Sequence, residues 1–324
     1  MKRREFIAGL GGAAAWPFAA RGQQQMAVVG FLNPGSAETF ADRLRGFRQG
    51  LKETGYVEAE NVAILYRWAE NQADRLPELA DELVRRKVSA IVAFVSAALA
   101  ARATTTTIPV VFLTAEDPVR LGLVESLARP GGNLTGVNML SGELTAKRLE
   151  LLHELLPRAS NISVLHYPAA ANAESTLKEL EAAARNLALK TRVVNASTNR
   201  EIDVAFAGFM IERPDALLVG SSDPFFSTRR VQLATLSARH AIPMISGTRE
   251  IAEVGGLMSY GPNFVDAWHQ IGIYTGQVLK GTKPAELPVW QTSKFELIIN
   301  AQIARMLGLT VPPSLLARAD EVIE

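Results

Sequence analysis

Apolar and polar positions along the chain follow two alternating periods, that of a buried strand and that of an amphipathic helix. Residues 26–32 (MAVVGFL) form a continuous apolar run, which is typical of a parallel strand buried on both faces. Phe40, Leu44, Phe47 and Leu51 then recur at the spacing of a helix with one apolar face. Further strands are predicted at 62–68, 88–95, 108–113 and 134–139, separated mostly by helical segments.

The same alternation restarts after Ser141. Strands are predicted at 162–166, 191–195, 216–220, 242–246, 255–260 and 295–300, and helices at 144–156, about 172–188, 200–212, 225–239 and 264–280. Regular alternation of strands and helices indicates parallel sheets covered by helices on both faces. The break near Ser141 and the similar segments 108–111 (IPVV) and 242–245 (IPMI) favour two sheets over one. The predicted fold class is α/β, with two doubly wound parallel-sheet lobes.

The first twenty-two residues have the pattern of an export signal. Lys2, Arg3 and Arg4 precede an apolar stretch at 6–20, and small residues follow around Arg21. This order is typical of a secretory signal, and the paired arginines resemble the twin-arginine type. The alternative is a short helix that stays attached. No later run reaches the ~18–20 apolar residues of a membrane span. We therefore expect residues 1–22 to be removed and the protein to be periplasmic.

Composition excludes several classes of site. The 34 Lys and Arg side chains nearly balance 33 Asp and Glu, so no basic excess points to a nucleic-acid partner. Cysteine is absent, which excludes disulfides, thiolate nucleophiles, Cys-ligated metals and a lipid-modified cysteine anchor. The four histidines are scattered, and no Walker loop, nucleophile elbow or zinc-protease motif occurs. We expect no cofactor, no metal and no enzymatic activity.

The loops after the strands are where a ligand site is expected. In open α/β sheets, ligands bind beyond the carboxyl ends of the strands. The candidate ligand-binding residues in these loops are Asn33, Ser36, Ser96, Ala97, Thr114, Asp117, Asn138, Tyr167, Ser221, Asp223, Phe225, Arg249 and Tyr260. Several of these loops lead directly into a helix, whose free N–H groups suit an anion such as a carboxylate.

Two polar roles are assigned within this set, each with an ordinary structural alternative. Main-chain N–H groups near Ser96 and Thr114 are candidates for a ligand carboxylate. Asp117 and Asp223 are placed to accept hydrogen bonds from an ammonium group or hydroxyls. Asp and Ser before a helix are also common helix caps, and both aspartates precede a proline, as in simple turns.

The aromatic candidates are expected to pack on an apolar ligand body. Tyr167, Phe225 and Tyr260 each lie at or just beyond the end of a predicted strand. Arg249 lies in the loop after strand 242–246 and is either a ligand contact or a surface cation.

Short segments in order along the chain resemble the ABC transporter substrate-binding protein family that includes tryptophan- and tyrosine-binding members. The matching segments are GFLNPGS (30–36), FRQGL (47–51), GYV (55–57), YRWA (66–69), RPGGNLTGV (129–137), AKRLELL (146–152), DPFF (223–226), GGLMSYGP (255–262) and KFELIIN (294–300). The resemblance implies a type I periplasmic binding fold, with two lobes that close on a ligand. It implies crossings near 138–141, 261–263 and 281–294. Lobe one would comprise 23–139 with 262–282, and lobe two 140–261 with 283–324.

The resemblance and the absence of catalytic motifs predict an exported solute-binding protein of an ABC importer. The expected ligand is a small carboxylate-bearing molecule, such as an aromatic or branched-chain amino acid or an aromatic acid. The expected partner is a membrane permease, and the expected state is a monomer. Two alternatives stay open: a hydrolase of the same architecture that uses Asp223 with His166, and a sensory protein that delivers its liganded form to a membrane receptor.

Overall fold

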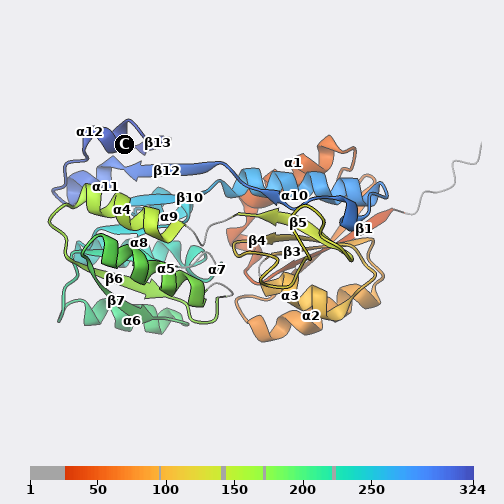
Figure 1. The fold of residues 1–324 in the computed structure, drawn as a ribbon, viewed down its shortest axis with the longest axis horizontal. Coiled ribbons are helices and arrows are strands. Elements are labelled where there is room, and N and C mark those ends of the chain that lie inside the picture. Colours follow the sequence, from red (N-terminus) through yellow and green to blue (C-terminus); the bar gives the residue numbers. More distant parts are fainter. Residues whose placement is uncertain (1–25, 95, 140–143, 171–172, 221–223) are drawn as a thin grey trace, which may run out of the picture.

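Two α/β lobes lie side by side, each built on its own sheet (Figure 1). The structure is a computed structural model that describes residues 26–94, 96–139, 144–170, 173–220 and 224–324. The sheet of lobe one has the strand order β11-β5-β4-β3-β1-β2, and that of lobe two the order β13-β12-β10-β9-β8-β6-β7. The predicted α/β class with two lobes is confirmed. The predicted export signal lies outside the described residues.

Lobe one is formed mainly by the first part of the chain. Its strands are β1 (Ala27–Asn33), β2 (Val62–Trp68), β3 (Ala90–Phe94), β4 (Val110–Thr114), β5 (Leu134–Asn138) and β11 (Trp290–Gln291). Its helices are α1 (Ala41–Glu53), α2 (Leu76–Arg85), α3 (Ser96–Thr104) and α10 (Phe264–Leu279), with short 3-10 turns at Ala37–Thr39, Ala73–Arg75 and Pro284–Glu286. Figure 1 shows α1 and α10 on one face of the sheet and α2 and α3 on the other.

Lobe two contains most of the remaining elements. Its strands are β6 (Asn161–His166), β7 (Lys190–Asn195), β8 (Ala216–Val219), β9 (Met244–Ser246), β10 (Met258–Pro262), β12 (Phe295–Asn300) and β13 (Glu321–Ile323). Its helices are α4 (Thr145–Leu155), α5 (Ala173–Asn186), α6 (Asn199–Gly208), α7 (Pro224–Ser227), α8 (Arg230–His240), α9 (Arg249–Glu253), α11 (Ala301–Met306) and α12 (Pro313–Leu316).

Each sheet buries both of its faces, which explains why its central strands are apolar throughout. On β3, Val92 joins the core cluster under α1 and α10, whereas its neighbour Ile91 joins the cluster under α2 and α3. On β8, Leu218 packs in one core cluster of lobe two, whereas its neighbour Leu217 packs in the other, on the opposite face of the sheet. Because successive side chains of a strand point to opposite faces, such a strand must be apolar at every position.

Three crossings join the lobes. The chain crosses after β5, between β10 and α10, and between β11 and β12. Asn138 accepts a main-chain hydrogen bond from Thr292 at 3.0 Å, and Lys294 accepts one from Asn263 at 3.3 Å, so the crossings are side by side. β11 pairs with β5 in lobe one, so residues up to Gln291 belong there, whereas the sequence placed 283–324 in lobe two.

Lobe two is not parallel throughout. β12 runs antiparallel to β10, and β13 runs parallel to β12. The reason is the connectivity: β10 leads out of lobe two toward a crossing, whereas β12 enters lobe two from one. All other strand pairs described in the two sheets are parallel, as predicted.

Glycines bring α1 and α10 into main-chain contact. An ideal Cβ on Gly50 would lie 1.9 Å from the carbonyl oxygen of His269, and one on Gly272 would lie 2.1 Å from that of Phe47. No side chain fits at these positions without a shift of the backbone. Since α10 follows directly on the second crossing, this contact anchors the returning segment to lobe one.

Candidate interlobe site

The loops that follow the strands of one lobe contact those of the other. Glu116, two residues beyond β4, accepts a hydrogen bond from Ser175 Oγ on α5 at 2.5 Å. Arg43 on α1 donates to Glu250 Oε1 on α9 from Nε at 3.2 Å and from Nη2 at 2.8 Å. Since α5 follows β6 and α9 follows β9, the carboxyl ends of strands in both lobes face one another. We call these opposed loops the interlobe face.

Arg43 and Glu250 form a largely buried ion pair. The Arg43 side chain is 4% exposed and that of Glu250 is 20% exposed. The Arg43 guanidinium also lies over the ring of Phe264, with Cζ 4.3 Å from the ring centroid. Burial is the largest influence on Glu250 and opposes its ionisation, but the charge and hydrogen bonds of Arg43, a main-chain N–H and the charge of Arg230 together keep the pKa of Glu250 below its usual value. The Glu250 carboxylate is therefore ionised at neutral pH.

The candidates of lobe one lie at the predicted strand ends. Asn33, Thr114 and Asn138 end β1, β4 and β5, Ser36 precedes the first 3-10 turn, and Ser96 and Ala97 begin α3. Asn33 is buried, and its Oδ1 accepts a hydrogen bond from the main-chain N–H of Gly35 at 2.8 Å. The Thr114 hydroxyl accepts a hydrogen bond from the N–H of Glu116 at 3.2 Å, so it closes its own turn. A ligand role for these six residues stays a proposal.

Asp117 closes a turn. Its Oδ1 accepts a hydrogen bond from the N–H of Val119 at 2.8 Å, and the residue is exposed. This is the capping alternative considered for it from the sequence. Its neighbour Glu116, which sequence reasoning missed, is only 5% exposed and binds both Ser175 and Arg120. In this loop, the acidic side chain that contacts the other lobe is therefore Glu116 and not Asp117.

The aromatic candidates Tyr167, after β6, and Phe225, on α7, pack against each other. Tyr167 and Phe225 stack with ring centroids 4.4 Å apart and planes 8° apart. The Arg229 guanidinium lies over the Phe225 ring, with Cζ 3.9 Å from the centroid. Two parallel groups cannot share one face of a ring, so both faces of Phe225 are covered, and it supports Tyr167 instead. The candidates Ser221 and Asp223 lie outside the described residues.

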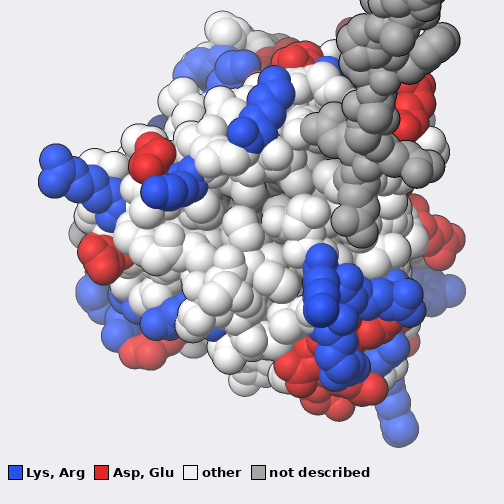
Figure 2. Space-filling model, turned by 90° about the vertical axis from the view of Figure 1, so that its right-hand side faces the viewer, with Lys and Arg blue, Asp and Glu red and all other residues white. Residues whose placement is uncertain are grey.

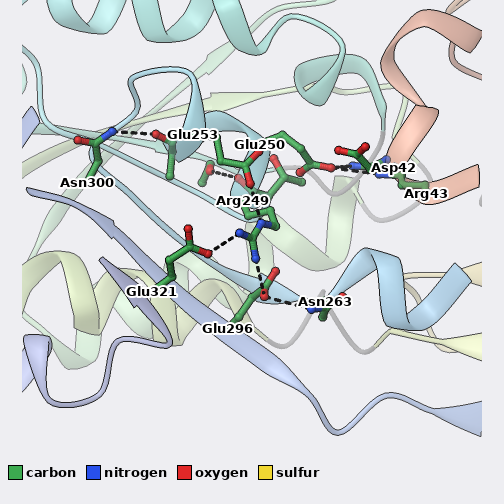
Figure 3. Close-up of polar contacts among 12 residues, drawn as sticks. Asp42, Arg43, Arg249, Glu250, Glu253, Asn263, Glu296, Asn300 and Glu321 are labelled. Atoms are coloured by element: carbon green, nitrogen blue, oxygen red, sulfur yellow. Dashed lines mark hydrogen bonds and ion pairs between the residues drawn. The ribbon is translucent and has the colours of Figure 1, made fainter. Parts of the chain in front are cut away.

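Arg249 is the centre of an ion-pair cluster within lobe two, which Figure 3 shows. Its Nε, Nη1 and Nη2 bind Glu253 at 2.8 Å, Glu296 at 3.1 Å and Glu321 at 2.5 Å. Asn263, which caps α10 at the second crossing, donates from Nδ2 to the same Glu296 carboxylate at 3.2 Å. Since each guanidinium nitrogen already binds a carboxylate, we interpret Arg249 as a brace of the crossings and no longer expect it to contact a ligand.

This cluster gives a pH-dependent stability prediction. Burial raises the pKa of Glu296 even with Arg249 beside it, and removing the cation should raise it further. A carboxyl whose pKa is higher in the folded than in the unfolded state loses stability as pH rises through the folded pKa. Arg249→Gln should therefore lower the free energy of unfolding by about 2 kcal/mol at pH 8 and by less at pH 5. Urea unfolding at both pH values measures this.

The matched control is Arg192→Gln, which removes a cation from the exposed pair with Glu212. Exposed pairs contribute ~0–1 kcal/mol, so little change is expected at either pH. The double variant Arg249→Gln/Glu296→Gln should recover most of the loss at pH 8. An equal loss at both pH values would contradict the assigned role of Glu296.

Tyr260 and Arg148 form a second polar contact on the interlobe face of lobe two. Arg148 Nε donates to the carbonyl oxygen of Tyr260 on β10 at 2.8 Å. The Arg148 side chain is 2% exposed, although it is a cation on a short helix. The sequence analysis did not select Arg148. The sequence nevertheless contains a sign of its role, because Arg148 shares the buried face of α4 with Thr145, Leu152 and Leu155. An arginine in an apolar helix stripe needs a specific partner.

Buried hydrogen-bonding atoms without a partner recur on the interlobe face. Among the described residues, such atoms include Asn33 Nδ2 in lobe one and Arg148 Nη2, His166 Nδ1, Thr176 Oγ1, Thr248 Oγ1 and Glu250 Oε2 in lobe two. Burial lowers the pKa of His166, so its ring is neutral at pH 7. Buried polar groups are nearly always hydrogen-bonded. These atoms could therefore form hydrogen bonds with a polar group that enters between the lobes.

The described residues offer little for other kinds of site. They contain no group of three or more His, Asp or Glu side chains arranged to bind a metal ion. Within the same ranges, no helix has the length and apolar character needed to cross a membrane. On the end of lobe one drawn in Figure 2, basic and acidic side chains alternate around a largely uncharged centre, apart from the surface covered by grey atoms.

Comparison with known proteins agrees with this geometry. A tyrosine-binding protein of Clostridioides difficile is 27% identical over 267 residues, which cover 82% of this chain and 76% of the relative. A conserved domain protein from Vibrio cholerae has a crystal structure similar to this one, with a TM-score of 0.85, 27% identity and coverage of 92% of this chain and 100% of that chain. An ABC domain of Streptococcus pneumoniae in complex with L-Trp has a TM-score of 0.83 and 28% identity, covering 92% and 99%.

The two-lobed fold is that of type I periplasmic binding proteins, which confirms the predicted architecture. The sequence model of ABC transporter substrate binding proteins matches residues 26–323, nearly the whole described chain. This chain therefore belongs to the ABC transporter substrate-binding protein family.

Proposed function

We propose that this protein is an exported solute-binding protein of an ABC importer, which closes its two lobes on a small carboxylate-bearing ligand. The observation that carries the proposal is the interlobe face, where loops of both lobes meet and buried polar atoms need partners. Hinge closure of two lobes around a ligand is a standard motion of binding proteins. The names of two similar proteins, a tyrosine-binding protein and a domain bound to L-Trp, favour an aromatic amino acid.

The same reasoning extends to location and partners. The twin-arginine-like signal in residues 1–22 supports delivery of a folded protein to the periplasm. There the liganded protein would meet a membrane permease as a monomer. A sensory protein would deliver the same closed, liganded form to a membrane receptor instead of a permease. Neighbouring genes that encode a permease and an ATPase would distinguish transport from sensing. We propose no catalytic role, because no observation favours the hydrolase alternative with Asp223 and His166.

Thermal unfolding of residues 23–324 against a small-molecule panel tests this function. The panel should contain aromatic and branched-chain amino acids, aromatic acids, sugars and nucleosides. A ligand at about 100 times its dissociation constant adds roughly 2.7 kcal/mol to the free energy of unfolding, which raises the Tm by several degrees. We expect this shift from an aromatic amino acid or a related acid and none from sugars.

A purified protein that already carries ligand would hide the shift, so the protein is first unfolded, dialysed and refolded. The small molecules released on unfolding are identified by mass spectrometry. A shift confined to sugars or nucleosides would contradict the proposed ligand class, and so would a released molecule without a carboxylate.

A further inference from the structure

Arg148 is a buried cation with an unused donor. It lies on α4, just beyond the first crossing, and its side chain is 2% exposed. Its Nε donates to the Tyr260 carbonyl oxygen, whereas Nη2 is buried and has no hydrogen-bond partner among the described residues. Burial lowers the pKa of Arg148 to about 10, so the guanidinium is still charged at neutral pH.

The guanidinium reaches the interlobe face. An ideal Cβ on Gly247 would lie 2.7 Å from Arg148 Nη2 and 2.9 Å from its Cζ, so the guanidinium lies against the loop after β9. Three residues further along the chain, in the first turn of α9, Glu250 binds Arg43 of lobe one. Thr248, between them, has a buried hydroxyl that lacks a partner among the described residues. The Arg148 guanidinium therefore lies next to a loop that contacts the other lobe.

The charge of Arg148 is incompletely compensated within lobe two. No carboxylate of the described residues forms an ion pair with it, although Glu179 and Tyr260 favour its charged form through space. Burying a cation without a directly bound anion costs several kcal/mol. One hydrogen bond to a main-chain carbonyl does not require a charge, since a neutral amide would make it equally well. A charged group at this position therefore indicates an anionic partner that binds at the interlobe face.

We infer that Arg148 binds the carboxylate of the ligand and thereby selects solutes with an anionic end. This inference rests on the proposed function and deepens it, because it assigns a carboxylate-binding residue in lobe two. From the sequence, the carboxylate was expected at lobe one, near Ser96 and Thr114. A carboxylate bound to Arg148 would accept charge-assisted hydrogen bonds. These bonds would attach the ligand to lobe two, opposite Asn33 in lobe one.

The test separates the carboxylate from the rest of the ligand. L-tryptophan and tryptamine, which lacks only the carboxylate, are titrated calorimetrically into refolded wild type, Arg148→Met and Arg148→Gln. The wild type should bind L-tryptophan about 100-fold more tightly than tryptamine. In both variants this ratio should fall to about fivefold or less, through weaker L-tryptophan binding at unchanged tryptamine affinity. Arg148→Gln keeps a donor for the Tyr260 carbonyl, and circular dichroism checks that each variant is folded.

Lys147→Met is the matched control. Lys147 is the adjacent residue on the same helix, and its side chain is 41% exposed and pairs with Glu150. This variant should keep the wild-type ratio. An unchanged ratio in Arg148→Met, or an equal loss of both affinities, would overturn the inference and leave the proposed function standing. A wild type that binds neither probe, or binds tryptamine as tightly as L-tryptophan, would overturn the inference together with the aromatic amino acid assignment.

Discussion

Replacing Arg43 by methionine is expected to open the two lobes and to weaken ligand binding, with little change in thermal stability. The ion pair of Arg43 with Glu250 joins lobe one to lobe two and is largely buried. Removing one partner of a buried pair leaves the other charge uncompensated, at a cost of ~2–5 kcal/mol. Within one lobe this cost would destabilise the fold. Between lobes, the protein avoids it when the lobes separate and water reaches Glu250.

The affinity for ligand should fall about 30-fold, which corresponds to the lower end of that cost. A ligand that binds the closed form loses affinity in proportion to the closed population. Small-angle scattering without ligand should give a larger radius of gyration for the variant than for the wild type. Calorimetry with the ligand identified by thermal shift measures the affinity.

Arg45→Met is the matched control, because Arg45 is on the same helix, is 75% exposed and pairs with the exposed Asp42. It should leave the radius of gyration and the affinity unchanged. Glu250→Gln should act in the same direction as Arg43→Met. If Arg43→Met instead lowers the Tm by several degrees and leaves the affinity intact, then the pair is a static link between the two lobes.

Gly50→Ala is expected to destabilise lobe one strongly. The new Cβ would lie 1.9 Å from the His269 carbonyl oxygen and 3.0 Å from the main-chain nitrogen of Ile273. Since the obstacle is backbone, α1 and α10 must move apart, and the core around Phe47 and Trp268 loosens. We expect a loss of about 3 kcal/mol in the free energy of unfolding and a Tm lower by roughly 6 °C or more.

Gly208→Ala is the control for this substitution. Gly208 is also helical, at the end of α6, and an added Cβ would meet nothing closer than Arg192 at 3.9 Å. Alanine favours a helix by up to ~1 kcal/mol over glycine, so stability should be unchanged or slightly higher. Urea unfolding of both variants compares them. A loss below 0.5 kcal/mol for Gly50→Ala would show that the two helices can separate at little cost.

The sequence predicted the fold class because each central strand is apolar throughout and is followed by a helix pattern. It did not predict β11 or β13, because two or three residues are too few to show a period. The assignment of residues 283–291 to lobe two differs for the same reason, because Trp290 and Gln291 pair with β5 of lobe one. The antiparallel direction of β12 follows from which lobe its chain enters, and residue pattern carries no such information.

The sequence predicted which loops form the candidate site better than it predicted which side chains in them make contacts. Asp117 closes a local turn with Val119, which was one of the two roles considered for it from the sequence. Arg249 binds Glu296 and Glu321, and a residue pattern does not reveal partners so distant in sequence. Arg43 and Arg148 were missed because a charged side chain on a helix is usually solvated. Both lie on the buried face of their helices, beside Phe47 and Leu152 respectively. Their interruption of an apolar stripe is the signal that distinguishes them from surface cations.

We propose that a carboxylate-bearing solute binds between the two lobes. The most direct measurement is a crystal structure of residues 23–324 with the panel compound that gives the largest thermal shift. We expect one molecule in contact with both lobes, with its carboxylate on Arg148 and the Arg43–Glu250 pair formed. A molecule that touches only one lobe, or one bound away from the loops after β1 and β9, would contradict the claim.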